Sequence, residues 1–254
     1  MGGAVVRAIQ QSPEIKLVGA IDKPSSARLG KDAGEVSAAG RLGILITDKL
    51  DAVLKPNRVI IDFTNPEASL DYLRAAAREK VSIVIATTGF NATQQAEIKR
   101  LARRTPTLLS ANTSLGVNVL VSLLGKAAKM LGDDYDVEIV EAHHRFKKDA
   151  PSGTALALGR SVASALDRDL DKVGINGRKG IVGERSKKEI ALHSVRAGDI
   201  VGEHIVIFGG IGERLEFIHR AHSRDTFARG AIRAAKWLAN KNPGLYGMQD
   251  VLGL

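Results

Sequence analysis

The order of apolar segments in the first half of the chain most constrains its fold. Short runs rich in Val, Ile and Leu alternate there with longer segments of helical periodicity. The predicted strands are 17–21, 58–63, 81–86 and 107–110, and the predicted helices are 4–11, a segment beginning near Glu67, and 92–103. Strands that are apolar on both faces and separated by helices predict a parallel α/β sheet covered on both sides. In such sheets, ligands bind at the turns that follow the carboxyl ends of the strands.

The pattern changes after about residue 114. Three strand-like segments follow one another there without an intervening helix, at 189–196, 203–208 and 214–219. They come after a helix at 118–131, a strand at 135–142 and a helix at 152–166. This order predicts a second domain of α+β class with an antiparallel or mixed sheet. We expect the first domain at 1–114, completed by a C-terminal helix within 224–254, and the second at 115–223.

The densest cluster of chemically active side chains lies in the run 141–155. His143 and His144 stand side by side, and histidine exchanges protons near neutral pH. Lys147 can hold a carboxylate as a point charge. The Ser152-Gly153-Thr154 turn begins a helix, and the backbone N–H groups at a helix start attract anions. The run therefore predicts a site for a small, negatively charged substrate that must be protonated.

Simpler interpretations remain open for each of these features alone. Adjacent histidines can be exposed polar residues of a loop, and a Ser-Gly-Thr sequence can be an ordinary helix N-cap. A metal site is not expected. Neighbouring residues of a strand point to opposite faces, and the chain has no His-x-x-x-His pair.

Composition argues against several other functions. The 254 residues include no cysteine, which favours a reducing, cytoplasmic location. We expect neither a signal peptide nor a membrane-spanning segment, because no uninterrupted apolar run is long enough. The net charge is +9, but the basic residues are scattered and only 4% of the chain is aromatic, so nucleic-acid binding is not expected. A positive field also suits anionic metabolites and a phosphorylated cofactor.

Asp22 and Lys23 follow the predicted strand 17–21 and indicate a dinucleotide site. An acidic residue at this position can hold a ribose hydroxyl, as in a Rossmann-like sheet. The lysine beside it could instead bind the 2′-phosphate of NADPH. Taken alone, an Asp-Lys pair after a strand is often a solvated turn, so the pair leaves the choice between NADPH and NADH open.

The run 141–155 as a whole is more specific than its parts. Its pattern, Glu-Ala-His-His-x-x-Lys-x-Asp-Ala-Pro-Ser-Gly-Thr-Ala, resembles the signature of the dihydrodipicolinate reductase (4-hydroxy-tetrahydrodipicolinate reductase) family. Further matches to that family lie at 62–67, 87–90, 110–118 and 195–204, so the resemblance extends over the whole chain. It implies a Rossmann-like domain followed by a mixed-sheet substrate domain.

The resemblance also implies an activity and roles for individual residues. The reaction is the reduction of 4-hydroxy-tetrahydrodipicolinate, or its dehydrated form, to tetrahydrodipicolinate with NADPH or NADH, in diaminopimelate and lysine biosynthesis. His143 is the implied proton donor and Lys147 the second catalytic residue. His144, Lys147 and the turn Ser152, Gly153 and Thr154 are the implied ligands of this small cyclic dicarboxylate. The implied cofactor-binding residues are Gly2, Asp22, Lys23, Phe63, Thr64, Ala86, Thr87, Thr88, Ser110, Ala111, Asn112 and Thr113.

The chain departs from the family pattern at its start. Family members begin with a strand that runs into a Gly-x-x-Gly-x-Met-Gly turn for the pyrophosphate, and Met1-Gly2 aligns with the end of that turn. Roughly 15 residues, about one strand and its glycine loop, have no counterpart. We expect that the native protein starts upstream, and that the chain as written binds NADPH poorly and has two strands with unpaired edges.

Two other functions stay open at this point. One is another Rossmann oxidoreductase acting on a different small dicarboxylate. The other is a non-catalytic or cofactor-impaired relative, for which the missing glycine turn is the only support. The family forms homotetramers through the second-domain sheet, and we expect the same here because the strand 203–208 carries apolar residues on both faces.

Overall fold

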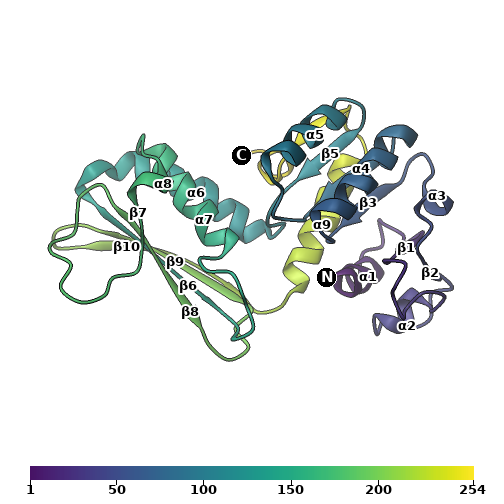
Figure 1. The fold of residues 1–254 in the computed structure, drawn as a ribbon, viewed down its shortest axis with the longest axis horizontal. Coiled ribbons are helices and arrows are strands. Elements are labelled where there is room, and N and C mark those ends of the chain that lie inside the picture. The colour runs from purple at the N-terminus through teal and green to yellow at the C-terminus, as the bar shows by residue number, and fades with distance from the viewer. The chain divides into compact units, whose positions relative to one another are not determined.

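The computed structural model describes residues 1–254, which form two compact units. The first unit comprises residues 1–115 and 224–253, and the second comprises residues 116–223 together with Leu254. Figure 1 shows that each unit has its own sheet and its own helices. The two units are therefore described separately.

The first unit is a parallel α/β domain, as the alternating apolar segments predict. Four parallel strands form its main sheet in the order β11-β5-β4-β3, and β1 and β2 form a separate parallel pair. Its strands are β1 (Ala20–Ile21), β2 (Ile46–Thr47), β3 (Val59–Asp62), β4 (Ser82–Ile85), β5 (Pro106–Leu109) and β11 (Gly244–Tyr246). Its helices are α1 (Gly2–Gln10), α2 (Ala33–Val36), α3 (Leu50–Val53), α4 (Pro66–Glu79), α5 (Ala92–Ala102), α9 (Asp225–Leu238) and α10 (Met248–Leu252).

Successive side chains of β4 point to opposite faces of the sheet, and each face is covered by helices. Ile83 and Ile85 pack with Leu70, Leu73 and other residues of α4 and α5. Val84, which points the other way, packs with α9 and α10. All four residues of β4 are buried, which is the pattern of a central parallel strand.

Local signals in the sequence explain where the helices begin. Asn65 accepts a hydrogen bond from the Ala68 amide at 3.0 Å, and Pro66 stands in the first turn of α4. Asn91 and Gln94 form a reciprocal capping box at the start of α5, with both hydrogen bonds at 2.9 Å. Both helices thus start at the carboxyl end of a strand and leave a polar turn there.

The parallel sheet is interrupted between β1 and β3. Each of these strands has a strand partner on one side only, β2 for β1 and β4 for β3. Figure 1 shows the β1–β2 pair on the β3 side of the main sheet. The other edges of β1 and β3 have no strand partner. They explain two differences from the sequence prediction: the strand predicted at 17–21 is paired only over Ala20–Ile21, and Val59, Ile60 and Ile61 are half-buried rather than buried.

The second unit has a five-stranded mixed sheet in the order β10-β9-β6-β8-β7. β6 runs parallel to β8 and antiparallel to β9, so the sheet is mixed, as one of the two predicted forms. Its strands are β6 (Asp136–His143), β7 (Gly174–Asn176), β8 (Ile190–Arg196), β9 (Gly202–Gly209) and β10 (Arg214–Ala221). Its helices are α6 (Leu115–Leu131), α7 (Gly153–Ala165) and α8 (Leu170–Val173), with a 3-10 turn at Gly132–Asp134. The predicted fold class is confirmed for both units.

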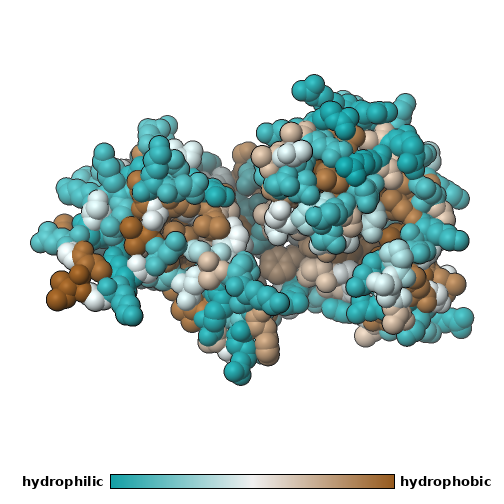
Figure 2. All heavy atoms as spheres, viewed as in Figure 1, coloured by the Kyte–Doolittle hydropathy of each residue, from teal (hydrophilic) through white to brown (hydrophobic).

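Helices cover only one face of this second sheet. Leu124 of α6 and Leu158 of α7 pack with buried strand residues such as Ile139 and Phe208. Figure 1 shows α6, α7 and α8 on the same side of the strands. On the sheet, Val195, Leu215 and Ile218 are each about 45% exposed, and Figure 2 shows hydrophobic residues at the visible surface of this unit.

One helical segment, Leu115–Asp134, is long and apolar enough by length and composition to cross a membrane. Its mean hydropathy reaches 1.3, although the segment contains Lys126 and Lys129. Leu120, Leu124 and Ala128 of this helix belong to the core of the second unit. The helix therefore packs within the fold through these residues, while its apolar residues Val119, Leu123 and Met130 are exposed.

The helices and strands that the sequence did not predict are all short. The elements β2, β7, β11, α2, α3, α8 and α10 have five residues or fewer, and periodicity over so few positions is not distinctive. The strand β11 completes the edge of the first sheet by pairing with β5. Its position after α9 explains why the C-terminal segment belongs to the first unit.

Candidate active site

A buried carboxylate holds the first histidine of the run. Glu141 and His143 are two residues apart on β6, so their side chains lie on the same face of the strand. The Nδ1 atom of His143 lies 2.6 Å from Oε2 of Glu141. The Glu141 side chain is fully buried, while that of His143 keeps 12% of its surface exposed. The histidine is therefore oriented by an internal partner, and part of its side chain is exposed.

Arg196, on the neighbouring strand β8, binds the same carboxylate. Its two terminal nitrogens each donate a hydrogen bond of 2.8 Å to Glu141, one to each oxygen. Parallel pairing places Arg196 opposite His143, and Glu141 opposite Ser194. A two-pronged guanidinium–carboxylate pair is rigid in geometry as well as strong. The pair fixes the position of the carboxylate that in turn fixes the histidine.

The charges of this cluster are set by its surroundings. Burial tends to raise the pKa of Glu141, but hydrogen bonds from Arg196 and His143 outweigh it and lower this pKa to about 2. Burial lowers the pKa of His143 below its ordinary value, and Glu141 opposes that shift. Near neutral pH, Glu141 is thus an anion and most His143 rings are neutral, while the lowered pKa makes the protonated ring a stronger acid.

His204, on β9, contacts the serine that caps the start of α7. The Ser152 hydroxyl lies 3.1 Å from Nε2 of His204 and accepts a hydrogen bond from the Ala155 amide at 3.1 Å. The Ser152 amide donates to Oε1 of Glu141 at 3.1 Å. Ser152 and His204 are 2% and 3% exposed. Ser152 therefore caps the helix and joins it to the Glu141 cluster, and its polar atoms already have internal partners.

The remaining residues of the run lie closer to solvent. Lys147 contacts both carboxylate oxygens of Asp149 at 2.8 Å, and its side chain is 20% exposed. The ring of His144 is 6.3 Å from that of Phe146, which is largely exposed. Gly153, the first residue of α7, is exposed, and an added Cβ there would meet no atom within 4 Å. The structure thus leaves open space in front of the helix start.

In the first unit, Asp62 is the centre of the turns at the carboxyl ends of β3 and β4. Its Oδ1 accepts hydrogen bonds from the amide and hydroxyl of Thr64, at 2.9 and 2.6 Å. Its Oδ2 accepts from the hydroxyls of Ser69 and Thr87. Asp62 is 2% exposed. One buried carboxylate therefore shapes both turns that carry predicted cofactor-binding residues.

The other predicted cofactor residues lie at neighbouring strand ends. Asp22 follows β1, accepts hydrogen bonds from the Ser26 hydroxyl at 2.7 Å and the Lys23 amide at 2.8 Å, and these lower its pKa. Phe63, Ala86 and Thr88 flank the Asp62 network, and Gly2 is the first residue of α1. Past β5, the Ser110 hydroxyl donates to the carbonyl of Asn112 at 2.8 Å, Ala111 is exposed, and the Thr113 hydroxyl donates to the carbonyl of Phe227 at 2.7 Å.

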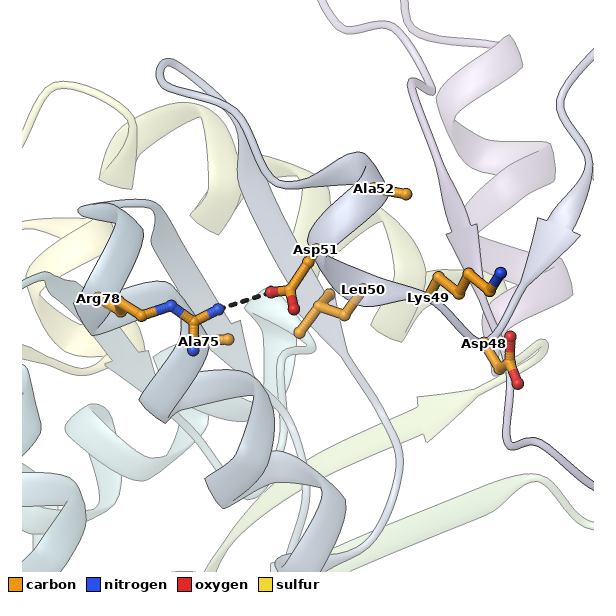
Figure 3. Close-up of a pocket in the computed structure, with 7 residues that line it drawn as sticks. All are labelled: Asp48, Lys49, Leu50, Asp51, Ala52, Ala75 and Arg78. Atoms are coloured by element: carbon orange, nitrogen blue, oxygen red, sulfur yellow. Dashed lines mark hydrogen bonds and ion pairs between the residues drawn. The ribbon is translucent and has the colours of Figure 1, made fainter.

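The hollow drawn in Figure 3 lies elsewhere in the first unit. It is lined by residues of α3, α4 and the turn before α3. Two of these residues, Arg78 and Asp51, form an ion pair with an N–O distance of 2.6 Å. Both of these side chains are more than half exposed. None of the predicted site residues lines this hollow. An exposed ion pair of this kind contributes little and holds no reactive group, so the hollow is not the candidate site.

Comparison with known proteins identifies the family of this chain. The family model "Dihydrodipicolinate reductase, N-terminus" matches residues 1–113, and the model "Dihydrodipicolinate reductase, C-terminus" matches residues 116–252. The chain belongs to the dihydrodipicolinate reductase family. The resemblance carried by the run 141–155 is thereby confirmed.

Curated relatives of the family match the chain from end to end. A protein named 4-hydroxy-tetrahydrodipicolinate reductase from Syntrophus aciditrophicus is 54% identical over 253 residues, which cover 100% of this chain and 94% of the relative. One of the same name from Syntrophotalea carbinolica is 52% identical over 254 residues, covering 100% and 95%. A solved dihydrodipicolinate reductase from Paenisporosarcina sp. TG-14, described as dipicolinate-bound, is 24% identical with a TM-score of 0.72. It covers 98% of this chain and 94% of that structure, and shares the fold.

The sequence predicts candidate reactive residues of this chain but not the residues that hold them. Glu141, Arg196 and His204 received no role, although each lies within a segment that matches the family. A signal was present in β6, where the buried positions Val137, Ile139 and Glu141 alternate. A carboxylate in such an apolar series must have strong partners, and strand pairing supplies Arg196 from a position 55 residues away.

Proposed function

We propose that this chain reduces 4-hydroxy-tetrahydrodipicolinate, or its dehydrated form, to tetrahydrodipicolinate with NAD(P)H. The observation that carries the proposal is the histidine of the family signature, held through Nδ1 by a fully buried carboxylate while part of its side chain stays exposed. Such a residue is built to transfer a proton. A non-catalytic relative would have no need of an oriented, part-buried His143.

The proton transfer follows from the geometry of His143. When the reduced nicotinamide is bound, it supplies a hydride to a carbon conjugated with the ring imine of the substrate, and negative charge builds toward the ring nitrogen. With Nδ1 committed to Glu141, the Nε2–H of protonated His143 is the group that donates a proton to that charge. A positioned acid of this kind accelerates such a step by about 10²–10⁴-fold.

The substrate carboxylates have candidate partners on the same segment. Lys147 is bound to Asp149 at the surface and can exchange that partner for a carboxylate of the substrate. The exposed start of α7 at Gly153 and Thr154 offers backbone amides and the positive end of the helix. His144 is the further candidate ligand. Ser152 acts through the helix start that it caps, since its hydroxyl already contacts His204.

The first unit carries groups that suit the two ends of a dinucleotide. Asp22, held by Ser26 and Lys23, suits the ribose hydroxyls, and the exposed side chain of Lys23 suits a 2′-phosphate. The turns around Asp62, with Phe63, Thr64, Ala86, Thr87 and Thr88, suit the nicotinamide end. For the pyrophosphate, the residues present offer the start of α1 at Gly2 and Gly3. We propose use of both NADPH and NADH.

The open face of the second sheet supports a homotetramer. Val195 and Ile218 are exposed there, and Ile205 and Ile207 are only half-buried. The apolar residues of a sheet face that no helix covers are stabilised by burial against a second copy. Light scattering at micromolar concentration tests this assembly, and a monomer would contradict it.

The function is tested by the consumption of NADPH. The purified chain is mixed with NADPH and 4-hydroxy-tetrahydrodipicolinate, and the absorbance of the reduced nicotinamide is followed. We expect consumption that depends on the substrate and that falls by about 100-fold in His143→Gln, with the KM for substrate within a few-fold. Consumption that is absent in the parent chain, or unchanged in the variant, contradicts the proposal.

A further inference from the structure

Glu141 stands at the junction of three groups that the proposed reaction needs. Its Oε2 contacts Nδ1 of His143, and its Oε1 accepts a hydrogen bond from the Ser152 amide. Both oxygens also accept hydrogen bonds from Arg196. The side chain has no exposed surface, and these three partners are within 3.1 Å. The proton donor and the start of the anion-binding helix are therefore attached to one carboxylate.

We propose that Glu141, clamped by Arg196, is the positioning residue of the active site. It directs Nε2 of His143 toward the substrate, places beside this histidine a negative charge that favours its protonated form, and fixes the start of α7 relative to it. The inference rests on the proposed function for its kinetic consequences. Its structural consequences, the tautomer and the titration of His143, do not depend on it.

The ring of His143 has no other partner that would set its orientation. The charged and titratable groups that face it are Glu141 on the same strand, Arg196 on β8, His204 on β9 and Lys147 on the following segment. His204 makes an edge-on contact, with ring centroids 5.3 Å apart. Of these groups, only Glu141 is an anion. Without Glu141, the histidine would face two cations and a buried neutral ring, and the cations disfavour a further positive charge on it.

The backbone of β9 at Gly202 lies close to Nε2, the other ring nitrogen of His143. A Cβ added at Gly202 would lie 3.1 Å from Nε2 of His143. A ring turned by a weaker partner would thus press against this strand or lose its contact with the carboxylate. The absence of a side chain at Gly202 leaves room at the nitrogen that must meet the substrate.

The same strand offers a matched control in Glu138. It pairs with Arg178 at 2.8 Å, Arg185 at 2.9 Å and His193 at 2.7 Å, so it too joins arginines to a histidine. Its pKa is lowered to about 2, as is that of Glu141. Being three residues away on β6, it points to the opposite face of the sheet. Glu138→Gln therefore removes a comparable ion cluster without touching His143.

The experiment compares Glu141→Gln with Glu138→Gln in the complete chain. Glutamine can still accept from Nδ1–H, so the change removes the charge and largely keeps the shape. We expect Glu141→Gln to lower the pKa of His143, followed by NMR of its ring, by roughly one unit or more. We also expect kcat to fall roughly 10-fold or more, with the high-pH limb of the kcat profile moved to lower pH by the same amount. Glu138→Gln should leave both the titration and the profile at their parent positions.

A purely structural role predicts a different result. Both variants would then lose thermal stability and activity together, with the His143 titration and the pH profile unmoved, and this outcome overturns the proposal. If the parent chain is inactive but the His143 pKa falls only in Glu141→Gln, the proposed function fails while the positioning role stands. The two failures are thus distinguishable.

A measurement on the parent chain covers the case in which Glu141→Gln does not fold. At a pH above the titration of His143, nitrogen-15 NMR reports which ring nitrogen carries the hydrogen. The geometry requires hydrogen on Nδ1, facing Glu141, and a bare Nε2. Hydrogen on Nε2 in the neutral ring contradicts the proposal without any variant.

Discussion

His204 makes the second unit sensitive to acid, and the effect can be worked out from the structure. The side chain is 3% exposed, its Nε2 contacts the Ser152 hydroxyl, and its Nδ1 has no hydrogen-bond partner. Burial, together with the neighbouring His143 and His219, lowers its pKa from 6.5 to about 3. A group whose pKa is depressed on folding contributes stability above its unfolded pKa, and this stability is lost as the pH falls toward the folded value.

The size of the effect follows from that shift. In the unfolded chain, His204 binds a proton as the pH falls below 6.5, while the folded chain stays neutral there until about pH 3. The free energy of unfolding of the second unit should fall by about 2 kcal/mol between pH 7 and pH 5 from this group alone. It should fall by about 5 kcal/mol once protonation is complete. Glu141, with a pKa of about 2, adds to the loss mainly below pH 5.

Hydrogen exchange followed by mass spectrometry measures this change in each unit separately. Two-domain chains seldom unfold in one step, so a single melting temperature would mix the units. Amides of β6 and β9 report the second unit, and those of β4 and β5 serve as an internal reference. The comparison is the parent chain against His204→Gln, with His222→Gln, an exposed histidine, as the matched control.

We expect the loss of protection in β6 and β9 between pH 7 and pH 5 to shrink by about 2 kcal/mol in His204→Gln. The control should behave as the parent does. An equal pH dependence in the parent and in His204→Gln would refute the reasoning, because the buried neutral histidine would then not be the group that binds the proton on unfolding.

Three further predictions concern the site itself. Lys147→Ala should raise the KM for substrate and weaken inhibition by pyridine-2,6-dicarboxylate by roughly 10-fold or more, because it removes a charge partner of a carboxylate; equal inhibition of parent and variant excludes that role. Lys23→Ala should shift the ratio of kcat/KM values toward NADH, and a variant that loses NADH activity but keeps NADPH activity reverses the assignment. Gly202→Ala, whose Cβ would lie 3.1 Å from Nε2 of His143, should lower kcat with little change in thermal stability, and an unchanged kcat shows that this nitrogen is not the donor.

Much of the fold could be predicted because its signals are local. Runs such as 81–86 are apolar on both faces, and Asn65-Pro66 marks a helix start without reference to distant residues. The short pairs β1–β2 and β5–β11 could not be predicted in the same way. They depend on neighbours that lie far away in the sequence, and β1 keeps only two paired residues beside an open edge.

The candidate site likewise has residues that the local sequence predicts and residues that it does not. His143, Lys147 and the start of α7 could be predicted, because their side-chain chemistry and spacing carry the family signature. The supporting roles of Arg196 and His204 arise from strand pairing, which brings β8 and β9 to either side of β6. Residue type alone gives no reason to join Arg196 to a glutamate on another strand.

The most direct test of the proposed reaction follows the hydrogen that is transferred. NADPH carrying deuterium at both C4 positions of the nicotinamide is incubated with the chain and 4-hydroxy-tetrahydrodipicolinate, and the product is analysed by mass spectrometry. We predict tetrahydrodipicolinate that carries one deuterium, formed about 100-fold more slowly by His143→Gln. Product without deuterium, or NADPH oxidised without formation of tetrahydrodipicolinate, would contradict the proposed function.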